Sequence, residues 1–256
     1  MRFLPGTSIP TTHILKKAPD GVDILEKEKL FSQEVVNASD LVHGTILGDS
    51  DINKRGVLTI EHSLDVAPYV MWKYLIMKEA GLLTFKSRPA LVQRARRSTR
   101  LCKAFSCNRL AYHMEVSPFY PLEKTTYSLR FNTKTLYLKE RKAFYSGKVG
   151  EKRVPANLDQ ILSPQSLAVW FMDDGGRGGN SREGMVLDVT GFCQEERNLI
   201  RRVLHDKFLI GSTIQQSSLN SRRKSAKIFI PKKWARPFKE IISPFLIPTM
   251  RYKIGD

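Results

Sequence analysis

Apolar and polar positions along the chain follow a plan that occurs twice. Residues 41–47 form an apolar stretch behind Ser39-Asp40, a pair typical of a helix N-cap. Residues 167–172 form a second apolar stretch behind Ser163-Pro164. Each stretch ends in an acidic turn, and after it the pattern predicts a strand pair, a helix, a second strand pair and a last helix. Neither copy has much core alone, so we expect two repeats that pack as a pseudo-two-fold pair.

The pattern predicts an α+β fold of two αββαββα repeats. Residues 1–38 are expected to form an N-terminal arm and a lead-in helix, residues 39–150 the first repeat and residues 151–256 the second. The other elements are predicted as helices at residues 66–79, 136–145, 194–208 and 234–242, and as strands at residues 57–62, 126–131, 184–190, 213–217 and 227–231.

Composition narrows the class of protein and its partner. The chain has 256 residues, of which 41% are hydrophobic, and this excludes a disordered chain. Three cysteines exclude a disulfide scaffold and favour a reducing compartment over secretion. No apolar run approaches the roughly 20 residues of a membrane span, so no membrane partner is expected. Lysine and arginine number 42 against 25 acidic residues, a net charge of +17, which points to a polyanion such as nucleic acid.

The acidic turns carry the candidate chemistry. Asp49 and Asp174 occupy matched positions 125 residues apart (174 − 49). Gly44 and Gly48, four apart, give the first helix a small face that lets another backbone approach. Two helices packed there would bring both carboxylates together, and a divalent cation of the Mg²⁺ type would relieve their repulsion. A pair of such ions suits in-line attack of water on a phosphodiester. A single Asp after a helix is usually only a turn residue, but two matched ones argue against that alternative.

Residues 41–50 (LVHGTILGDS) and 167–175 (LAVWFMDDG) resemble the two motifs of single-chain LAGLIDADG homing endonucleases. Residues 152–158, 228–231 and 244–253 resemble further stretches of the intron-encoded branch of that family, in the right order and spacing. The resemblance implies a saddle-shaped DNA-binding sheet with the two motif helices packed at its centre. It further implies a metal site for Mg²⁺ or Mn²⁺ formed by Asp49, Asp174, Gly48 and Asp173.

The same resemblance assigns roles to basic and polar residues near that centre. Lys152 and Lys253 fall on the basic positions that flank the active centre, where a lysine can stabilise charge on the phosphate. The strand after each motif usually lays polar side chains, often Gln, onto DNA. We expect His62 and Thr190 at those positions. Asp188 stands where Asn is common, and a carboxylate facing phosphate would be unfavourable unless it is paired.

Basic clusters are the candidate nucleic-acid contacts. We expect a loop between strands to carry Arg94, Arg96, Arg97 and Arg100, and the equivalent hairpin of the second repeat to carry Arg222, Arg223 and Lys224. A solvated charge run is the default alternative for one such cluster, and the matched pair favours DNA contact. Arg130 and Gln215, with their neighbours Asn132 and Gln216, are candidate readers of base edges.

Two functions compete. The first is a monomeric, metal-dependent, site-specific double-stranded DNA endonuclease of the group I intron type, which cuts one strand at each aspartate across the minor groove. The second is a non-cleaving RNA-binding protein of the same fold, such as a group I intron maturase or a protein associated with organellar ribosomal RNA. Asp49, Asp174, Lys152 and Lys253 favour the first, whereas His62, Thr190 and Asp188 favour the second. Either function suggests a mitochondrial or chloroplast location.

Overall fold

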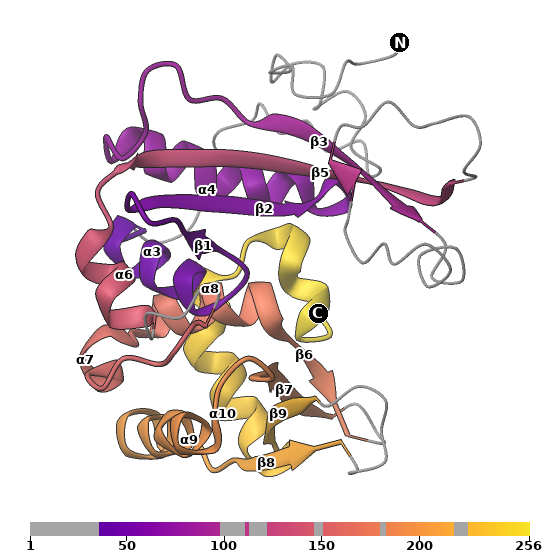
Figure 1. The fold of residues 1–256 in the computed structure, drawn as a ribbon. Helices are drawn as coiled ribbons and strands as arrows, with labels where there is room; N and C mark the ends of the chain where they lie inside the picture. Colours follow the sequence, from indigo (N-terminus) through magenta and orange to yellow (C-terminus); the bar gives the residue numbers. More distant parts are fainter. Residues whose placement is uncertain (1–35, 98–110, 113–121, 146–150, 180–182, 218–224) are drawn as a thin grey trace.

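The computed structural model describes residues 36–97, 111–112, 122–145, 151–179, 183–217 and 225–256. Within them, two antiparallel sheets lie on either side of a central helix pair, α3 (Ala38–Leu47) and α8 (Pro164–Asp174), as Figure 1 shows. The expected arm and lead-in helix fall almost entirely outside the described residues.

The first repeat builds a five-stranded sheet in the order β1-β2-β5-β3-β4. Its strands are β1 (Asp51–Ile52), β2 (Val57–Ser63), β3 (Ala90–Arg97), β4 (Ala111–Tyr112) and β5 (Leu122–Thr135), and its helices after α3 are the short η1 (Leu64–Val66), then α4 (Ala67–Glu79) and α6 (Leu138–Phe144). The second repeat builds a four-stranded sheet in the order β6-β7-β9-β8. Its strands are β6 (Gly175–Gly178), β7 (Gly184–Asp188), β8 (Thr213–Gln216) and β9 (Ala226–Ile230), and its helices besides α8 are α9 (Gln194–Phe208), α10 (Lys232–Ile242), η2 (Ser243–Phe245) and η3 (Pro248–Lys253), with α7 (Leu158–Ile161) ahead of α8.

The second repeat has the predicted αββαββα order from α8 onward. The first has the same order with one extra short strand, β4, between β3 and β5, and the α+β class is confirmed. The core runs through α3, α4 and α8 into both sheets, and Trp72 and Trp170 are fully buried in it. Among the described residues, no helix is both long enough and apolar enough to cross a membrane.

Helix starts differ in how well local signals specify them. Ser163 caps α8, because its hydroxyl accepts from the Ser166 N–H while the Ser166 hydroxyl accepts from the Ser163 N–H. The predicted cap at Ser39-Asp40 is wrong. The cap of α3 is Asn37, whose side chain accepts from the N–H groups of both residues, so the helix begins earlier.

The basic run of the first repeat is also placed differently from the prediction. Arg94, Arg96 and Arg97 do not lie in a loop, because β3 continues to Arg97 and pairs with β5 over that whole length. The strand length comes from its partner, since β5 spans 14 residues and offers a backbone ladder far longer than the predicted one. Arg100, Arg222, Arg223 and Lys224 lie outside the described residues.

Candidate active site

The two central helices approach each other closely where glycine replaces a side chain. A Cβ at Gly44 would lie 2.4 Å from the Ser166 carbonyl oxygen, and one at Gly48 would lie 2.3 Å from Asp173 Oδ2. No ordinary side chain fits at either position, so the predicted small face of the first helix is confirmed. The contact brings the C-terminal ends of α3 and α8 together, with Asp49 after one and Asp174 at the end of the other.

The carboxyl groups of Asp49 and Asp174 lie in the same cluster of charges, but their pKa values shift in opposite directions. Burial, together with the charges of Asp49 and Asp173, raises the pKa of Asp174 to about 7. A hydrogen bond from His62 lowers the pKa of Asp49, whose side chain is 49% exposed. Crowded carboxylates of this kind at the negative ends of two helices are stabilised by a cation.

A lysine binds the C-terminal carbonyl groups of each motif helix. Lys152 Nζ donates to the carbonyl oxygens of Gly48 at 2.6 Å and Ser50 at 2.9 Å. Lys253 Nζ donates to those of Met172 at 2.5 Å and Asp173 at 2.9 Å. Burial lowers the pKa of both lysines. Lys152 therefore binds the end of α3 in the same way as Lys253 binds the end of α8. Each ammonium has three N–H donors and uses two of them here, so one remains for another acceptor.

Asp173 has a buried ammonium as its partner. The Asp173 side chain is fully buried, and Lys73 Nζ, also fully buried, donates to its Oδ1 at 2.8 Å and its Oδ2 at 3.1 Å. The Tyr69 hydroxyl donates to Oδ1 at 2.8 Å, and the Asp49 N–H lies 3.4 Å from Oδ2. The carboxylate is therefore satisfied by protein donors alone, which leaves only the Asp173 backbone carbonyl for a metal.

His62 connects this buried pair to Asp49. Its Nδ1 lies 3.5 Å from Asp49 Oδ2, and its Nε2 lies 3.2 Å from Lys73 Nζ. One oxygen or nitrogen each from Asp49, His62 and Asp173 fall within 4.8 Å of one another, which is a metal-like grouping. The Lys73 ammonium, however, already occupies the cation position beside two of these residues, His62 and Asp173. A pocket of about 360 Å³ opens beside the group, lined by Asp49, Glu61, His62, Tyr69, Asp173 and Lys253 among others.

The strand positions that match across the repeats are not the expected ones. Glu61 lies six residues before the first residue of α4 (67 − 61), and Asp188 lies six before that of α9 (194 − 188). His62 thus corresponds to Val189, not to Thr190. In β2, Leu58 and Ile60 are buried, so strand alternation puts His62 on their side and Glu61 on the opposite face. The pairing of His62 with Thr190 was wrong because strand register shifted by one residue exchanges the two faces.

Each of these acidic residues faces a basic residue on the neighbouring strand. Glu61 is opposite Arg130, with Arg130 Nη1 4.0 Å from Glu61 Oε2, and Asp188 is opposite Lys227. Asp188 also contributes to the raised pKa of Asp174, so it lies toward the carboxylate centre. Gln215 is opposite Lys227 and shares its face. Gln216 instead donates to Gln194 of α9, and the Thr190 hydroxyl both donates to and accepts from the backbone of Ala226, so these side chains are held by the protein itself.

Comparison with known proteins shows which family has this arrangement of helices and side chains. A sequence model of the LAGLIDADG DNA endonuclease family matches residues 40–229, more than half of the chain. The chain belongs to the LAGLIDADG DNA endonuclease family. The DNA endonuclease I-ChuI of Chlamydomonas applanata is 26% identical over 224 residues, covering 85% of this chain and 94% of that protein. The cytochrome b mRNA maturase bI2 of Saccharomyces cerevisiae is 34% identical over 111 residues, 43% of this chain but only a quarter of the maturase.

A solved structure shares this LAGLIDADG fold over nearly the whole chain. The homing endonuclease I-WcaI, bound to its DNA recognition sequence, has a TM-score of 0.64 at 22% identity, and the alignment covers 96% of this chain and 98% of that one. At this identity the similarity shows the fold.

Sequence reasoning missed Lys73 and Tyr69 in this LAGLIDADG protein. Both lie on α4 within a run of buried residues, four positions apart and thus on one helical face. A lysine in such an apolar helix is a signal, since a buried charge requires a partner. The partner, however, lies 100 residues away along the chain.

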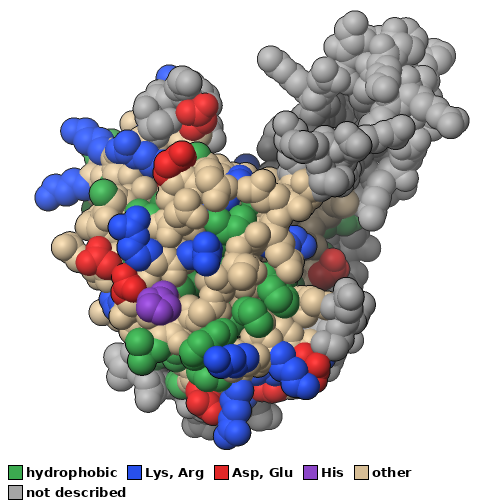
Figure 2. All heavy atoms as spheres, turned by 90° about the horizontal axis from the view of Figure 1, so that it is seen from below, with side chains coloured by type: hydrophobic (Ala, Val, Ile, Leu, Met, Phe, Trp, Pro, Cys, Tyr) green, Lys and Arg blue, Asp and Glu red, His purple; other side chains and the backbone are tan. Residues whose placement is uncertain are grey.

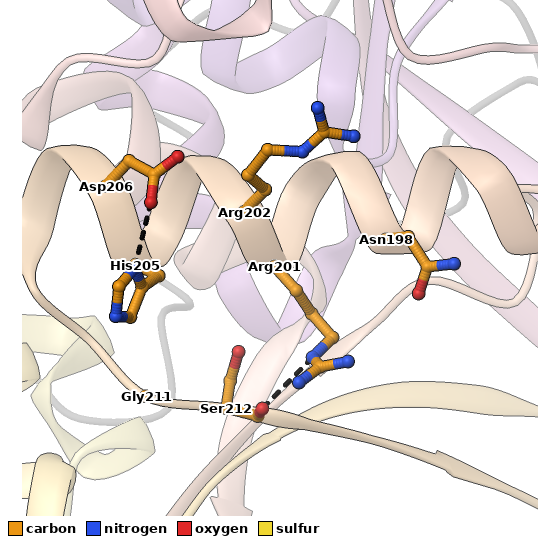
Figure 3. Close-up of a pocket in the computed structure, with 7 residues that line it drawn as sticks. All are labelled: Asn198, Arg201, Arg202, His205, Asp206, Gly211 and Ser212. Atoms are coloured by element: carbon orange, nitrogen blue, oxygen red, sulfur yellow. Dashed lines mark hydrogen bonds and ion pairs between the residues drawn. The ribbon is translucent and has the colours of Figure 1, made fainter.

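A second hollow lies on the outer side of the second repeat. It is lined by Asn198, Arg201, Arg202, His205, Asp206, Gly211 and Ser212, and Figure 3 shows Arg201 reaching the Ser212 carbonyl oxygen, 3.0 Å away, and His205 paired with Asp206. Seen from below in Figure 2, this end of the molecule mixes basic and acidic side chains. The hollow lacks the paired carboxylates and lysines of the helix termini.

Proposed function

We propose that this LAGLIDADG family member is a site-specific double-stranded DNA endonuclease that hydrolyses one phosphodiester in each strand. The carrying observation is the matched pair of half-sites. Each motif helix ends in an aspartate, Asp49 or Asp174, and each has a lysine bound to its last carbonyl groups. Two similar half-sites in one chain suit the two antiparallel strands of a duplex, and the differences between the repeats suit an asymmetric target bound by a monomer.

Divalent metal, Mg²⁺ or Mn²⁺, fits the residues at the helix ends. The carboxylates of Asp49 and Asp174 and the backbone carbonyl oxygens of Gly48 and Asp173 would hold it. These are hard oxygen ligands, and burial together with the charges of Asp49 and Asp173 raises the pKa of Asp174, an unfavourable environment for its carboxylate that a bound cation would relieve. A carbonyl oxygen has two lone pairs, so the lysine bonds leave one for the metal. When bound, such ions supply Lewis-acid activation of the phosphate and of the attacking water.

The chain itself positions and stabilises the phosphate. Lys152 and Lys253 each use two N–H donors on backbone carbonyls, so the third can reach a phosphate oxygen as negative charge develops there. Because the lysines are held by the helices that carry the aspartates, their distance from the carboxylates is set by the fold. Little reorganisation is then needed when the substrate binds.

DNA would lie across the sheet faces that carry Arg130, Lys227 and Gln215. Arg94, Arg96 and Arg97 in β3 would extend this basic surface, and Arg100, Arg222, Arg223 and Lys224 remain proposed contacts outside the described residues. Phosphate contacts would set the position on the duplex, and Arg130 and Gln215 would read base edges.

A non-cleaving RNA-binding role is the second candidate, and the identity to the bI2 maturase favours it. In that case the chain would bind group I intron or ribosomal RNA on the same basic surface. The matched Asp and Lys pairs would then have no chemical role, which is why the endonuclease is preferred. Relatives with names such as cytochrome b mRNA maturase and intron-encoded endonuclease support an organellar location, mitochondrion or chloroplast, for either role.

The deciding experiment is cleavage of a plasmid that carries the intronless allele of the host gene, or of a randomised-site library, with Mg²⁺ and with EDTA. We expect linearisation at one locus with Mg²⁺ only. Asp49→Asn and Asp174→Asn should each reduce the product to a nick in one strand with DNA binding retained, whereas Asp206→Asn, on the exposed surface of α9, should leave cleavage unchanged. Tight binding of intron or ribosomal RNA without any cut would establish the second candidate instead.

A further inference from the structure

The two half-sites differ at one strand position beside the aspartate. His62 lies five residues before α4 (67 − 62), and Val189 lies five before α9 (194 − 189). The His62 ring reaches Asp49, with Nδ1 3.5 Å from Oδ2. Val189 is buried and apolar, so the matched position of the second repeat cannot donate a hydrogen bond. Only one aspartate therefore has a histidine at this strand position.

The buried lysine determines which ring nitrogen of His62 carries the proton. An ammonium has three donors and no acceptor. Lys73 Nζ has three acceptors within reach: Asp173 Oδ1 at 2.8 Å, Asp173 Oδ2 at 3.1 Å and His62 Nε2 at 3.2 Å. When the ammonium donates to Nε2, that nitrogen is the acceptor and the ring proton is on Nδ1, although Nε2 also lies 3.5 Å from Asp173 Oδ1. That N–H is the group that faces Asp49.

The lysine is itself held from the far side. Asp173 accepts from the Tyr69 hydroxyl, which also lies 3.2 Å from the Val169 carbonyl oxygen in the motif helix. The Tyr69 ring packs 5.2 Å from the His62 ring and 4.4 Å from Lys73 Nζ. Exposure rises along the series, from none for the Asp173 and Lys73 side chains to 8% for His62 and 49% for Asp49. The buried Asp173 and Lys73 side chains thus hold His62, and His62 in turn contacts the half-exposed Asp49 carboxylate.

We infer that His62 is a positioning residue that orients the Asp49 carboxylate, with Lys73 setting its tautomer. The Asp49 half-site therefore has an orienting donor that the Asp174 half-site lacks at the matched position. The inference rests on the proposed endonuclease function for its kinetic consequence, but not for the tautomer. A direct metal-ligand role for His62 is disfavoured, because the Lys73 ammonium already binds His62 Nε2 and both Asp173 oxygens.

The first test needs neither metal nor cleavage. In the full chain labelled with ¹⁵N-histidine, the imidazole nitrogens of His62, assigned by their loss in His62→Gln, should show the Nδ1–H tautomer. Lys73→Met, which removes the donor to Nε2, should shift the ring toward the Nε2–H form. An Nε2–H ring in the wild-type protein, or a ring unaffected by Lys73→Met in a variant that remains folded, would overturn the inference. Zn²⁺ or Cd²⁺ shifting the His62 nitrogens directly would make it a ligand and would do the same.

The second test resolves the strands. On a duplex labelled differently at each 5′ end, His62→Phe should slow nicking of the Asp49 strand roughly tenfold or more, as loss of a group behind a metal ligand commonly does, with the other strand unchanged. His62→Gln, which keeps an N–H donor, should restore part of that rate. His205→Gln, at an exposed histidine of α9, is the matched control.

The outcomes separate the inference from the proposed function. Equal slowing of both strands, or no slowing of either, would reject His62 as a positioning residue while the endonuclease stands. A wild-type protein that nicks neither strand would reject the endonuclease, and the tautomer measurement would then decide the role of Lys73 and His62 alone.

Discussion

The two repeats differ at two pairs of matched positions, one at the end of each motif helix and one in the long helix that follows. The residue before the motif aspartate is Gly48 in the first repeat and Asp173 in the second. Six residues into the following helix, the first repeat has Lys73 (73 − 67) and the second has Ile200 (200 − 194). Asp173 of the second repeat is therefore paired with Lys73 of the first, whereas the matched residues, Gly48 and Ile200, carry no charge.

The comparison shows that a buried charge is kept as a complete pair or not at all. Desolvation of Lys73 lowers its pKa, and the Asp173 carboxylate opposes that shift. Either charge alone would be an unpaired ion in the core, whereas the Gly48 and Ile200 arrangement avoids the cost altogether. The lysine and the aspartate come from different repeats, so the pair also joins them.

The largest expected effect comes from breaking this pair on one side. Lys73→Met should lower the free energy of unfolding by about 3–5 kcal/mol, because the buried Asp173 carboxylate is left without the cation that neutralises it. Converting the pair to the arrangement of the other side, Lys73→Ile with Asp173→Gly, should recover most of that loss. Urea denaturation of the wild type, both single variants and the double variant measures the coupling. Additive losses in the double variant would show that the two residues do not depend on each other.

The close approach of Gly48 to Asp173 can be disrupted by adding one methyl group. Gly48→Ala should cost about 1–3 kcal/mol, since its Cβ would overlap Asp173 Oδ2 and force the helices apart. Gly191→Ala is the matched control, because a Cβ there meets nothing within 4 Å. Thermal unfolding of both variants checks this. Equal effects of the two substitutions would mean that helix separation is not what Gly48 controls.

Asp49 and Asp174 are expected to change the stability of the fold with pH in opposite directions. The folded pKa of Asp174, about 7, lies above its ordinary value of 3.8, so this group destabilises the metal-free fold increasingly as pH rises from about 4 to above 7. In EDTA at pH 8, Asp174→Asn should therefore raise stability by about 1–2 kcal/mol. The folded pKa of Asp49 is lowered, so Asp49→Asn should lower stability above pH 4. Melting temperatures against pH test both, and a stabilising Asp49→Asn would contradict the difference.

The smallest expected effect concerns the DNA contacts of the two sheets, with Lys227 in the second and Arg130 in the first. Lys227→Gln should reduce the slope of the logarithm of DNA affinity against the logarithm of salt concentration by roughly 0.9, the value for one lost phosphate contact. Arg130→Gln should change it less, because Arg130 already pairs with Glu61. Lys232→Gln, whose lysine pairs with Glu183 on the exposed surface, is the control. Identical slopes for the Lys227 variant and the wild type would exclude a phosphate contact.

Sequence patterns specified what depends on neighbours along the chain. The motif helices and the Gly44 and Gly48 face arise from local spacing, and each was predicted. Short elements such as β1 were missed, because two residues carry no periodicity and the strand exists only through its pairing with β2. The extent of β3 was likewise set by β5, a distant partner.

The site itself was predictable only in part. The two aspartates can be located by repeat matching and the two lysines by the family resemblance, and the structure brings all four to the helix ends. The role of His62 depends on strand register and on Lys73, and Lys73 depends on Asp173 in the other repeat. Contacts between residues separated by 100 positions or more leave no signal in a single sequence.

The buried pair also has a consequence for which halves can associate. Two copies of the second repeat would bring two Asp173 carboxylates to one interface without the Lys73 ammonium that binds the carboxylate oxygens. Two copies of the first would bury two Lys73 ammonium groups against two glycines. Only unlike repeats neutralise the charge, so we expect separately expressed halves to choose each other over themselves. A repeat that duplicated and then diverged in this way would be committed to a single asymmetric chain.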